Sequence, residues 1–218
     1  MVISFPAAVI FALLLNELKN SMFKKTVQTI TYLPHFISLV VVCGMITDFF
    51  SSDGIITRLL CMLGGKDINY LGYPQYFKSI YVWTNVWQNV GWDSIIYLAA
   101  LAGVNTELYE AAKVDGANRF RQLITVTIPG IAPTIAIMLI LKIGQMMSVG
   151  YEKIILLYNQ STYETADVIS SFVYRRGLGE SAQYSYSAAV GMFQSVINFV
   201  LLLSANHFSS KYADTSLF

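Results

Sequence analysis

Polar side chains interrupt two long apolar runs of the sequence. Asp93 lies midway through the run 81–104, and Lys142 lies in the run 130–150. If these runs cross a membrane, ionisable residues within them are costly and often mark the pathway of a solute or an ion. The candidates for such a pathway are Gln88, Asn89, Trp92, Asp93 and Gln145. Hydrogen bonding between helices is the alternative role, and the spacing leaves an Asp93–Lys142 pair open.

Motifs of enzymes and metal sites are absent from the sequence. Gly64-Gly65-Lys66 lacks the earlier glycine and the hydroxyl residue of a phosphate-binding loop, and neither H-E-x-x-H nor G-x-S-x-G occurs. The two cysteines, Cys43 and Cys61, are expected to be free thiols. We therefore predict no catalytic residue, no metal and no bound cofactor. If the protein moves a solute, the energy must come from an ion gradient or from a partner.

The composition is that of an integral membrane protein. Hydrophobic residues make up 55% of the 218 residues and charged residues 12%, whereas soluble domains contain roughly 25% charged residues. A net charge of +1 gives no basic field for nucleic acid. Runs of about 20 mostly apolar residues can span a bilayer. Four runs meet this length, 31–50, 81–104, 130–150 and 187–205, and a fifth, 1–15, is interpreted as the tail of a spanning helix whose beginning is missing.

Lysine and arginine in the connections indicate the orientation, because cytoplasmic loops carry the excess. Residues 16–30, 105–129 and the tail together hold seven, and residues 51–80 and 151–186 hold six. The first group lies in shorter connections, so its density is higher, and we place it in the cytoplasm.

The two connections on the outer side contain predicted helices. Apolar residues repeat at three and four positions in 53–65, which predicts a short helix in the membrane interface, capped by Asp53 and ended by Gly64. In 161–177, Ser161 and Glu164 have capping-box spacing, and Arg175 and Arg176 precede a terminating Gly177. The loop 151–186 is therefore expected to carry a helix outside the membrane.

The connection 105–129 is polar and predicts two short helices around a glycine. Asn105 or Thr106 can cap the first helix, and Asp115 can cap the second. Gly116 permits backbone angles that other residues resist, and Pro129 is expected to stop the pattern where the next span begins.

This segment carries a resemblance to a known family. Glu110-Ala111-Ala112, Gly116 after three residues, and Val126-Thr127-Ile128-Pro129 after nine more resemble the EAA motif of the membrane subunits of binding-protein-dependent ABC importers. In the usual pattern the positions of Val126 and Ile128 are Ile and Leu, so the departures are conservative. From position 16 onward the chain is similar to the oligosaccharide branch of these permeases.

The resemblance implies an all-α membrane protein with the type I ABC importer permease fold, with about five spanning helices present and an N-terminal helix missing. Residues 1–218 would form one transmembrane permease domain in a bacterial cell membrane, crossing it several times. The loop 105–129 would be the cytoplasmic coupling loop, which inserts into an ATPase subunit. The residues that match the motif or its usual companions are Glu110, Ala111, Ala112, Asp115, Gly116, Ala117 and Pro129.

The same resemblance implies the partners and the solute. Such permeases work with ATPase subunits that bind the ATP, with a second permease and with an extracytoplasmic sugar-binding protein, surrounded by lipid. Trp92 or Trp87 could stack on a sugar ring while amides bind its hydroxyls. The expected function is therefore ATP-driven import of a carbohydrate. A secondary transporter driven by an ion gradient is the alternative, although no internal repeat favours it.

Overall fold

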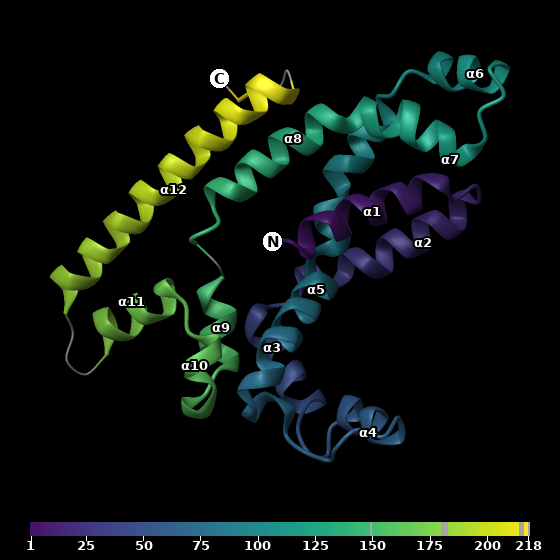
Figure 1. The fold of residues 1–218 in the computed structure, drawn as a ribbon. Coiled ribbons are helices and arrows are strands. Elements are labelled where there is room, and N and C mark those ends of the chain that lie inside the picture. The colour runs from purple at the N-terminus through teal and green to yellow at the C-terminus, as the bar shows by residue number, and fades with distance from the viewer. Residues whose placement is uncertain (149, 180–182, 214–215, 218) are drawn as a thin grey trace. The chain divides into compact units, whose positions relative to one another are not determined.

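The computed structural model describes residues 1–148, 150–179, 183–213 and 216–217 (Figure 1). These residues form helices and connecting turns, and no β-strand occurs among them. The α-helices are α1 (Ser4–Glu17), α2 (Ser21–Tyr32), α3 (Leu39–Phe49), α4 (Ile55–Met62), α5 (Pro74–Ala102), α6 (Thr106–Val114), α7 (Arg119–Gln122), α8 (Ile128–Gly144), α9 (Tyr151–Leu157), α10 (Tyr163–Ala166), α11 (Ile169–Leu178) and α12 (Tyr184–Ala213).

The chain divides into two compact units. Unit 1 contains Met1–Tyr32, Asn89–Gln145 and Asn198–Phe218, and unit 2 contains Leu33–Gln88 and Met146–Ile197. The long helices α5 and α12 contribute residues to both units.

Unit 1 packs α1 against the second half of α5 and the first half of α8. Its buried core consists of Ala8, Ala12, Tyr97, Leu101 and Ile131. Small residues of α1 face the large Tyr97 ring, so the helices can approach closely while the aromatic side chain fills the space between them. The EAA segment emerges from this packed unit.

Unit 2 has its own apolar core, formed by α3, the start of α5, and α9. Val42, Cys43 and Ile46 of α3 lie at its centre, together with Phe77 and Ile80 of α5. The two cysteines are free, as the sequence predicts.

Two helical segments are long and apolar enough to cross a membrane among the residues described. They are Arg119–Gly144 and Tyr184–Lys211, and Ser21–Phe36 with Leu39–Phe49 would make a third if the bent pair is one span. The predicted span 81–104 corresponds to α5, which is 29 residues long but is not among these segments. The predicted span tail 1–15 forms the shorter apolar helix α1.

The predicted span 31–50 is not one continuous helix. The chain bends by 100° between Ser21–Phe36 and Leu39–Phe49. Pro34 lies at the bend, and a proline disfavours the helical conformation of the residue before it and lacks an N–H to donate. As a result, α2 ends at Tyr32, and a short 3-10 turn leads to the separate helix α3.

Two details of the predicted outer loops also differ. Helix α4 forms, but Gly54 occupies its N-cap and no side chain caps it, so Asp53 does not have the expected role. The segment 161–177 is not one helix, because the chain is extended at Asp167 between α10 and α11. The Ser171 hydroxyl accepts from the Val168 N–H at 3.0 Å and starts α11 afresh.

Candidate functional site: the coupling hairpin and the polar residues of the helices

The first helix of the EAA segment has a well-formed N-terminus. The Asn105 side chain accepts from the Glu107 N–H at 2.9 Å, which satisfies one of the free donors of α6. Glu107 lies in the first turn and Lys113 in the last, each at the end of the helix dipole that favours its charge. The polar sequence alone therefore specifies α6, and of the two predicted caps the structure uses Asn105.

Gly116 ends this helix in a Schellman motif. The Ala117 N–H donates to the Ala112 carbonyl at 2.9 Å, and the Gly116 N–H donates to the Lys113 carbonyl at 3.0 Å. Gly116 has φ of +75°, a left-handed conformation that costs other residues free energy. The glycine of the EAA motif thus sets the angle at which the chain leaves α6.

The second helix begins later than the sequence predicts. Asn118 caps α7 by accepting from the Arg121 N–H at 2.9 Å, whereas Asp115 is the C-cap of α6. The prediction that Asp115 caps the second helix is therefore wrong, because the glycine turn separates this residue from α7.

Pro129 does not stop the helix that follows, contrary to prediction. Helix α7 continues through a π-helical turn, Leu123–Thr127, into α8, so that Arg119–Gly144 is one segment (Figure 1). Proline clashes with the carbonyl four residues earlier in a regular helix. The wider π turn lies directly before Pro129, where it relieves this clash, and such turns are frequent at functional sites.

Side-chain hydrogen bonds hold the two arms of the hairpin together. The hydroxyls of Tyr109 and Thr127 are 3.0 Å apart, and Thr127 is buried within the π turn. The Gln122 amide donates to the Ala117 carbonyl at 2.8 Å. We call the segment Asn105–Pro129 the coupling hairpin, after the role that the resemblance implies for it. The sequence analysis missed the Tyr109–Thr127 bond, because no local pattern relates residues 18 positions apart.

The outer surface of the coupling hairpin is apolar as well as charged. Glu110 and Ala111 are exposed and Ala112 is half-buried. No residue of α6 is buried. Large apolar side chains are also exposed there, namely Leu108, Val114, Phe120 and Ile124. Four exposed large apolar side chains on one short polar segment make it a candidate surface for contact with another protein.

The coupling hairpin also meets the end of α1. Arg119 donates to the Glu17 carboxylate at 3.4 Å, and both side chains are largely exposed. Exposed ion pairs contribute little stability, so this contact adds little to what holds the hairpin in place.

The polar residues of α5 and α8 come together in unit 1. Lys142 Nζ lies 3.7 Å from the Asp93 carboxylate, which confirms the pair that spacing left open. Asn89 is one turn before Asp93 on α5, and Gln145 is the C-cap of α8, three residues after Lys142. The side chain of Trp92 is exposed.

Gln88, the remaining candidate, belongs to unit 2 and is buried. Its burial fits helix packing better than direct contact with a solute.

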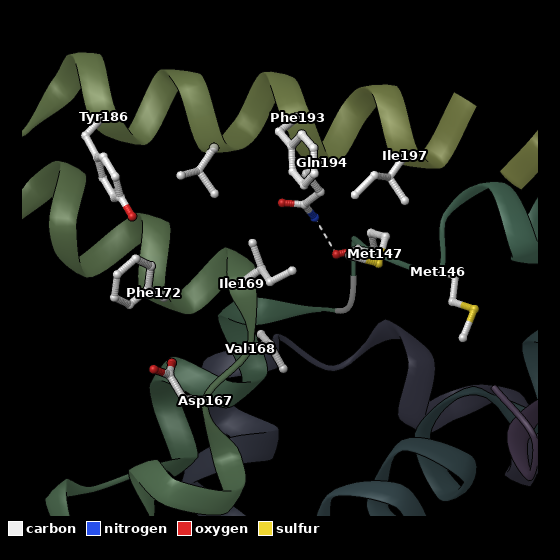
Figure 2. Close-up of a pocket in the computed structure, with 11 residues that line it drawn as sticks. Met146, Met147, Asp167, Val168, Ile169, Phe172, Tyr186, Phe193, Gln194 and Ile197 are labelled. Atoms are coloured by element: carbon white, nitrogen blue, oxygen red, sulfur yellow. Dashed lines mark hydrogen bonds between the residues drawn. The ribbon is translucent and has the colours of Figure 1, made fainter. Parts of the chain in front are cut away.

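Unit 2 contains a cavity that the sequence analysis did not anticipate (Figure 2). It has a volume of about 650 Å³ and is lined by α11, the start of α12 and the chain before α9. Gln194 reaches from α12 and donates to the Met147 carbonyl and, at 3.1 Å, to the Ser170 hydroxyl. These bonds join α12 to α11 and to the chain before α9.

An ion pair beside this cavity fixes the start of α11. The Arg175 guanidinium donates to both carboxylate oxygens of Asp167, at 3.0 and 2.5 Å, and lies over the rings of Tyr158 and Tyr163. Burial raises the pKa of Asp167, but hydrogen bonds from Arg175 and Ser171 outweigh it and hold the pKa below its ordinary value. From the sequence alone, Arg175 is predicted only to lie near the end of a helix.

The chain is similar to known membrane transport proteins. The model of the family described as "binding-protein-dependent transport system inner membrane component" matches residues 4–214. The chain is 41% identical over 217 residues to the polygalacturonan/rhamnogalacturonan transport system permease protein YteP of Bacillus subtilis, covering 99% of this chain and 67% of that protein. It is 41% identical over 216 residues to the protein LplB of Bacillus subtilis, covering 99% of this chain and 68% of that one.

A solved structure is similar over the same length. In the crystal structure of a bacterial alginate ABC transporter in complex with an alginate pentasaccharide-bound periplasmic protein, one chain is 44% identical, with a TM-score of 0.95 over 99% of this chain and 75% of that chain. The EAA spacing, the helical fold and the family match all agree. The chain therefore belongs to the inner membrane components of binding-protein-dependent transport systems, the permeases of ABC importers.

Proposed function

We propose that this protein is the permease subunit of an ATP-driven carbohydrate importer and that its coupling hairpin docks into a separate ATPase subunit. The exposed apolar side chains on an otherwise polar hairpin are the observation that carries the proposal. The hairpin 105–129 would face the cytoplasm, and the loop 151–186 would face outward in a bacterial cell membrane that the chain crosses several times.

The chemistry of the coupling hairpin suits this docking. Ala111 and Ala112 have small side chains that let α6 seat closely in a groove, while Leu108 and Phe120 supply apolar contact. Glu110 lies on the same helix, where its carboxylate can pair with a basic group of the ATPase. Since the hairpin continues into α8, movement of the ATPase would be passed directly to a membrane helix.

A saccharide is the proposed solute. The named relatives with stated solutes include permeases for polygalacturonan and rhamnogalacturonan and for lactose. Asn89, Trp92 and Gln145 offer amides for hydroxyl groups and an indole ring for stacking on a sugar. The pathway would run between this subunit and a second permease, and an extracytoplasmic sugar-binding protein would deliver the saccharide.

Reconstitution tests the proposal. The protein would be coexpressed with a candidate ATPase, second permease and binding protein, purified as a complex and placed in liposomes. We expect saccharide uptake that requires ATP and persists when ionophores collapse all ion gradients. Uptake that continues without ATP hydrolysis and stops with the ionophores would instead identify a secondary transporter.

A further inference from the structure

An exposed arginine lies beside the cavity of unit 2. The Arg176 guanidinium carbon lies 5.6 Å from the centroid of the Phe172 ring, and Phe172 packs edge-on against Tyr186 with ring centroids 6.4 Å apart. Both rings line the cavity, as Figure 2 shows. Tyr186 is 50% exposed, so part of its ring is open to a ligand.

The two neighbouring arginines have different surroundings. Arg175 is fully engaged by Asp167 and by two tyrosine rings. Arg176 is exposed, and no carboxylate forms an ion pair with it within the described part of the chain. Among the described residues, no carboxylate therefore competes for its five N–H donors, which match a carboxylate in planar, bidentate geometry.

The cavity supplies the other groups that a sugar needs. Aromatic rings offer apolar faces for the C–H side of a pyranose, and a few polar groups orient it. The Gln194 amide nitrogen is held by Met147 and Ser170, which leaves its carbonyl oxygen to accept from a hydroxyl group. A neutral sugar would use mainly the rings and the amide, whereas a sugar with a carboxylate would in addition form a charge-assisted, bidentate pair with Arg176.

We propose that Arg176, Phe172 and Tyr186 form a contact site for a uronic acid residue of the saccharide. The ring of Tyr186 stacks on the sugar, and Arg176 binds the carboxylate. This inference rests on the proposed function and deepens it, because it names acidic saccharides as the preferred class of solute. It also places a selective contact in the loop 151–186 and the start of α12, rather than among the residues of α5 and α8.

Binding of a defined oligosaccharide tests the site. The complete transporter without its binding protein would be placed in nanodiscs of phosphatidylcholine and titrated calorimetrically with trigalacturonate and, separately, with maltotriose. We expect Arg176→Gln to weaken trigalacturonate binding about 10-fold or more, the typical effect of one lost charged hydrogen bond, and to leave maltotriose binding unchanged. Arg58→Gln, an equally exposed arginine of α4, is the matched control and should change neither affinity.

A second pair of variants tests the aromatic part. Tyr186→Phe keeps the ring and should preserve trigalacturonate binding, whereas Tyr186→Ala should weaken it. Equal affinities of native protein and Arg176→Gln for trigalacturonate, or equal losses for both saccharides, would overturn the proposal. So would an effect of Arg176 that arises only in discs containing phosphatidylglycerol, because the arginine would then bind lipid.

The two proposals fail in different ways. If the complex imports maltotriose with ATP but Arg176→Gln leaves trigalacturonate binding intact, the uronate site is wrong and the importer stands. If ATP drives no saccharide uptake in the native complex, the proposed function itself is wrong.

Discussion

Replacing Gly116 by valine should uncouple transport from ATP hydrolysis. Gly116 adopts φ of +75°, and a Cβ atom placed there would meet no other atom within 4 Å. The substitution is therefore free of steric contact, and its cost is the backbone conformation alone. For residues other than glycine the left-handed conformation costs about 1–2 kcal/mol, and a branched side chain makes it worse.

This cost reduces the population of hairpins that keep the Schellman turn. A change of about 1–2 kcal/mol corresponds to a factor of roughly 5–30 in an equilibrium. If the seated hairpin transmits the motion, saccharide uptake per ATP hydrolysed in proteoliposomes should fall several-fold or more, while the protein remains in the membrane. Gly116→Asn should retain most of the coupling, because asparagine tolerates the left-handed conformation better than other residues.

Gly44 of α3 provides the matched control. A Cβ there also meets nothing within 4 Å, and this glycine is helical. Gly44→Val should thus leave the ratio of uptake to hydrolysis unchanged. The reasoning is refuted if Gly116→Val transports with native coupling, or if Gly44→Val and Gly116→Val lose coupling equally.

Three further predictions concern single contacts. Tyr109→Phe and Thr127→Val both remove the Tyr109–Thr127 hydrogen bond, so each should cost about 1 kcal/mol of stability and lower coupling. Thr127→Val also removes the weaker bond to the Gln122 carbonyl, so the double variant should be no less stable than Thr127→Val alone; additive losses in thermal melts would contradict this. Burial lowers the pKa of Lys153 to about 8, against the ordinary lysine value of 10.5. Between these two pH values the unfolded chain binds more protons than the folded chain, so the stability of the fold should rise with pH. Lys153→Met should abolish this rise. Stability is measured as the temperature at which the buried Cys43 thiol becomes accessible to a labelling reagent. The pKa of Asp167 is lowered, so the carboxylate stabilises the fold above about pH 4, and this contribution is lost as the pH falls further. Asp167→Asn should remove that acid sensitivity in thermal melts recorded from about pH 6 to about pH 2.

The coupling hairpin was largely predictable because its signals are local. The N-cap Asn105 and the turn at Gly116 depend on residues a few positions away, and the structure has both. Where two local signals compete, the sequence alone misleads. Asp115 is a good N-cap by type, yet the Schellman turn after α6 moves the start of α7 to Asn118.

Contacts between distant segments depend on how the helices pack, which local patterns do not specify. Asp93 and Lys142 carry opposite charges in two apolar helices, and only the packing of α5 beside α8 shows that they meet. Tyr109 gave no signal at all, since its partner lies beyond a turn and inside a π-helical segment. The length of a helix is equally non-local, because the π turn lets α7 continue past Pro129 into the span.

This continuity connects the two halves of the proposed mechanism within unit 1. The segment from Thr127 to Lys142 rises about 22 Å at about 1.5 Å per residue, which is most of the thickness of a bilayer core. The Tyr109–Thr127 bond ties the hairpin to the foot of this helix, and Lys142 near its far end is paired with Asp93 of α5. If an ATPase displaces the hairpin as proposed, one member of the ion pair would move relative to the other, and Asn89 and Gln145 lie one turn from its two members. The proposed function therefore requires the geometry of the Asp93–Lys142 pair to depend on the position of the hairpin, so Lys142→Met should reduce saccharide uptake per ATP hydrolysed; unchanged coupling in that variant would contradict this link.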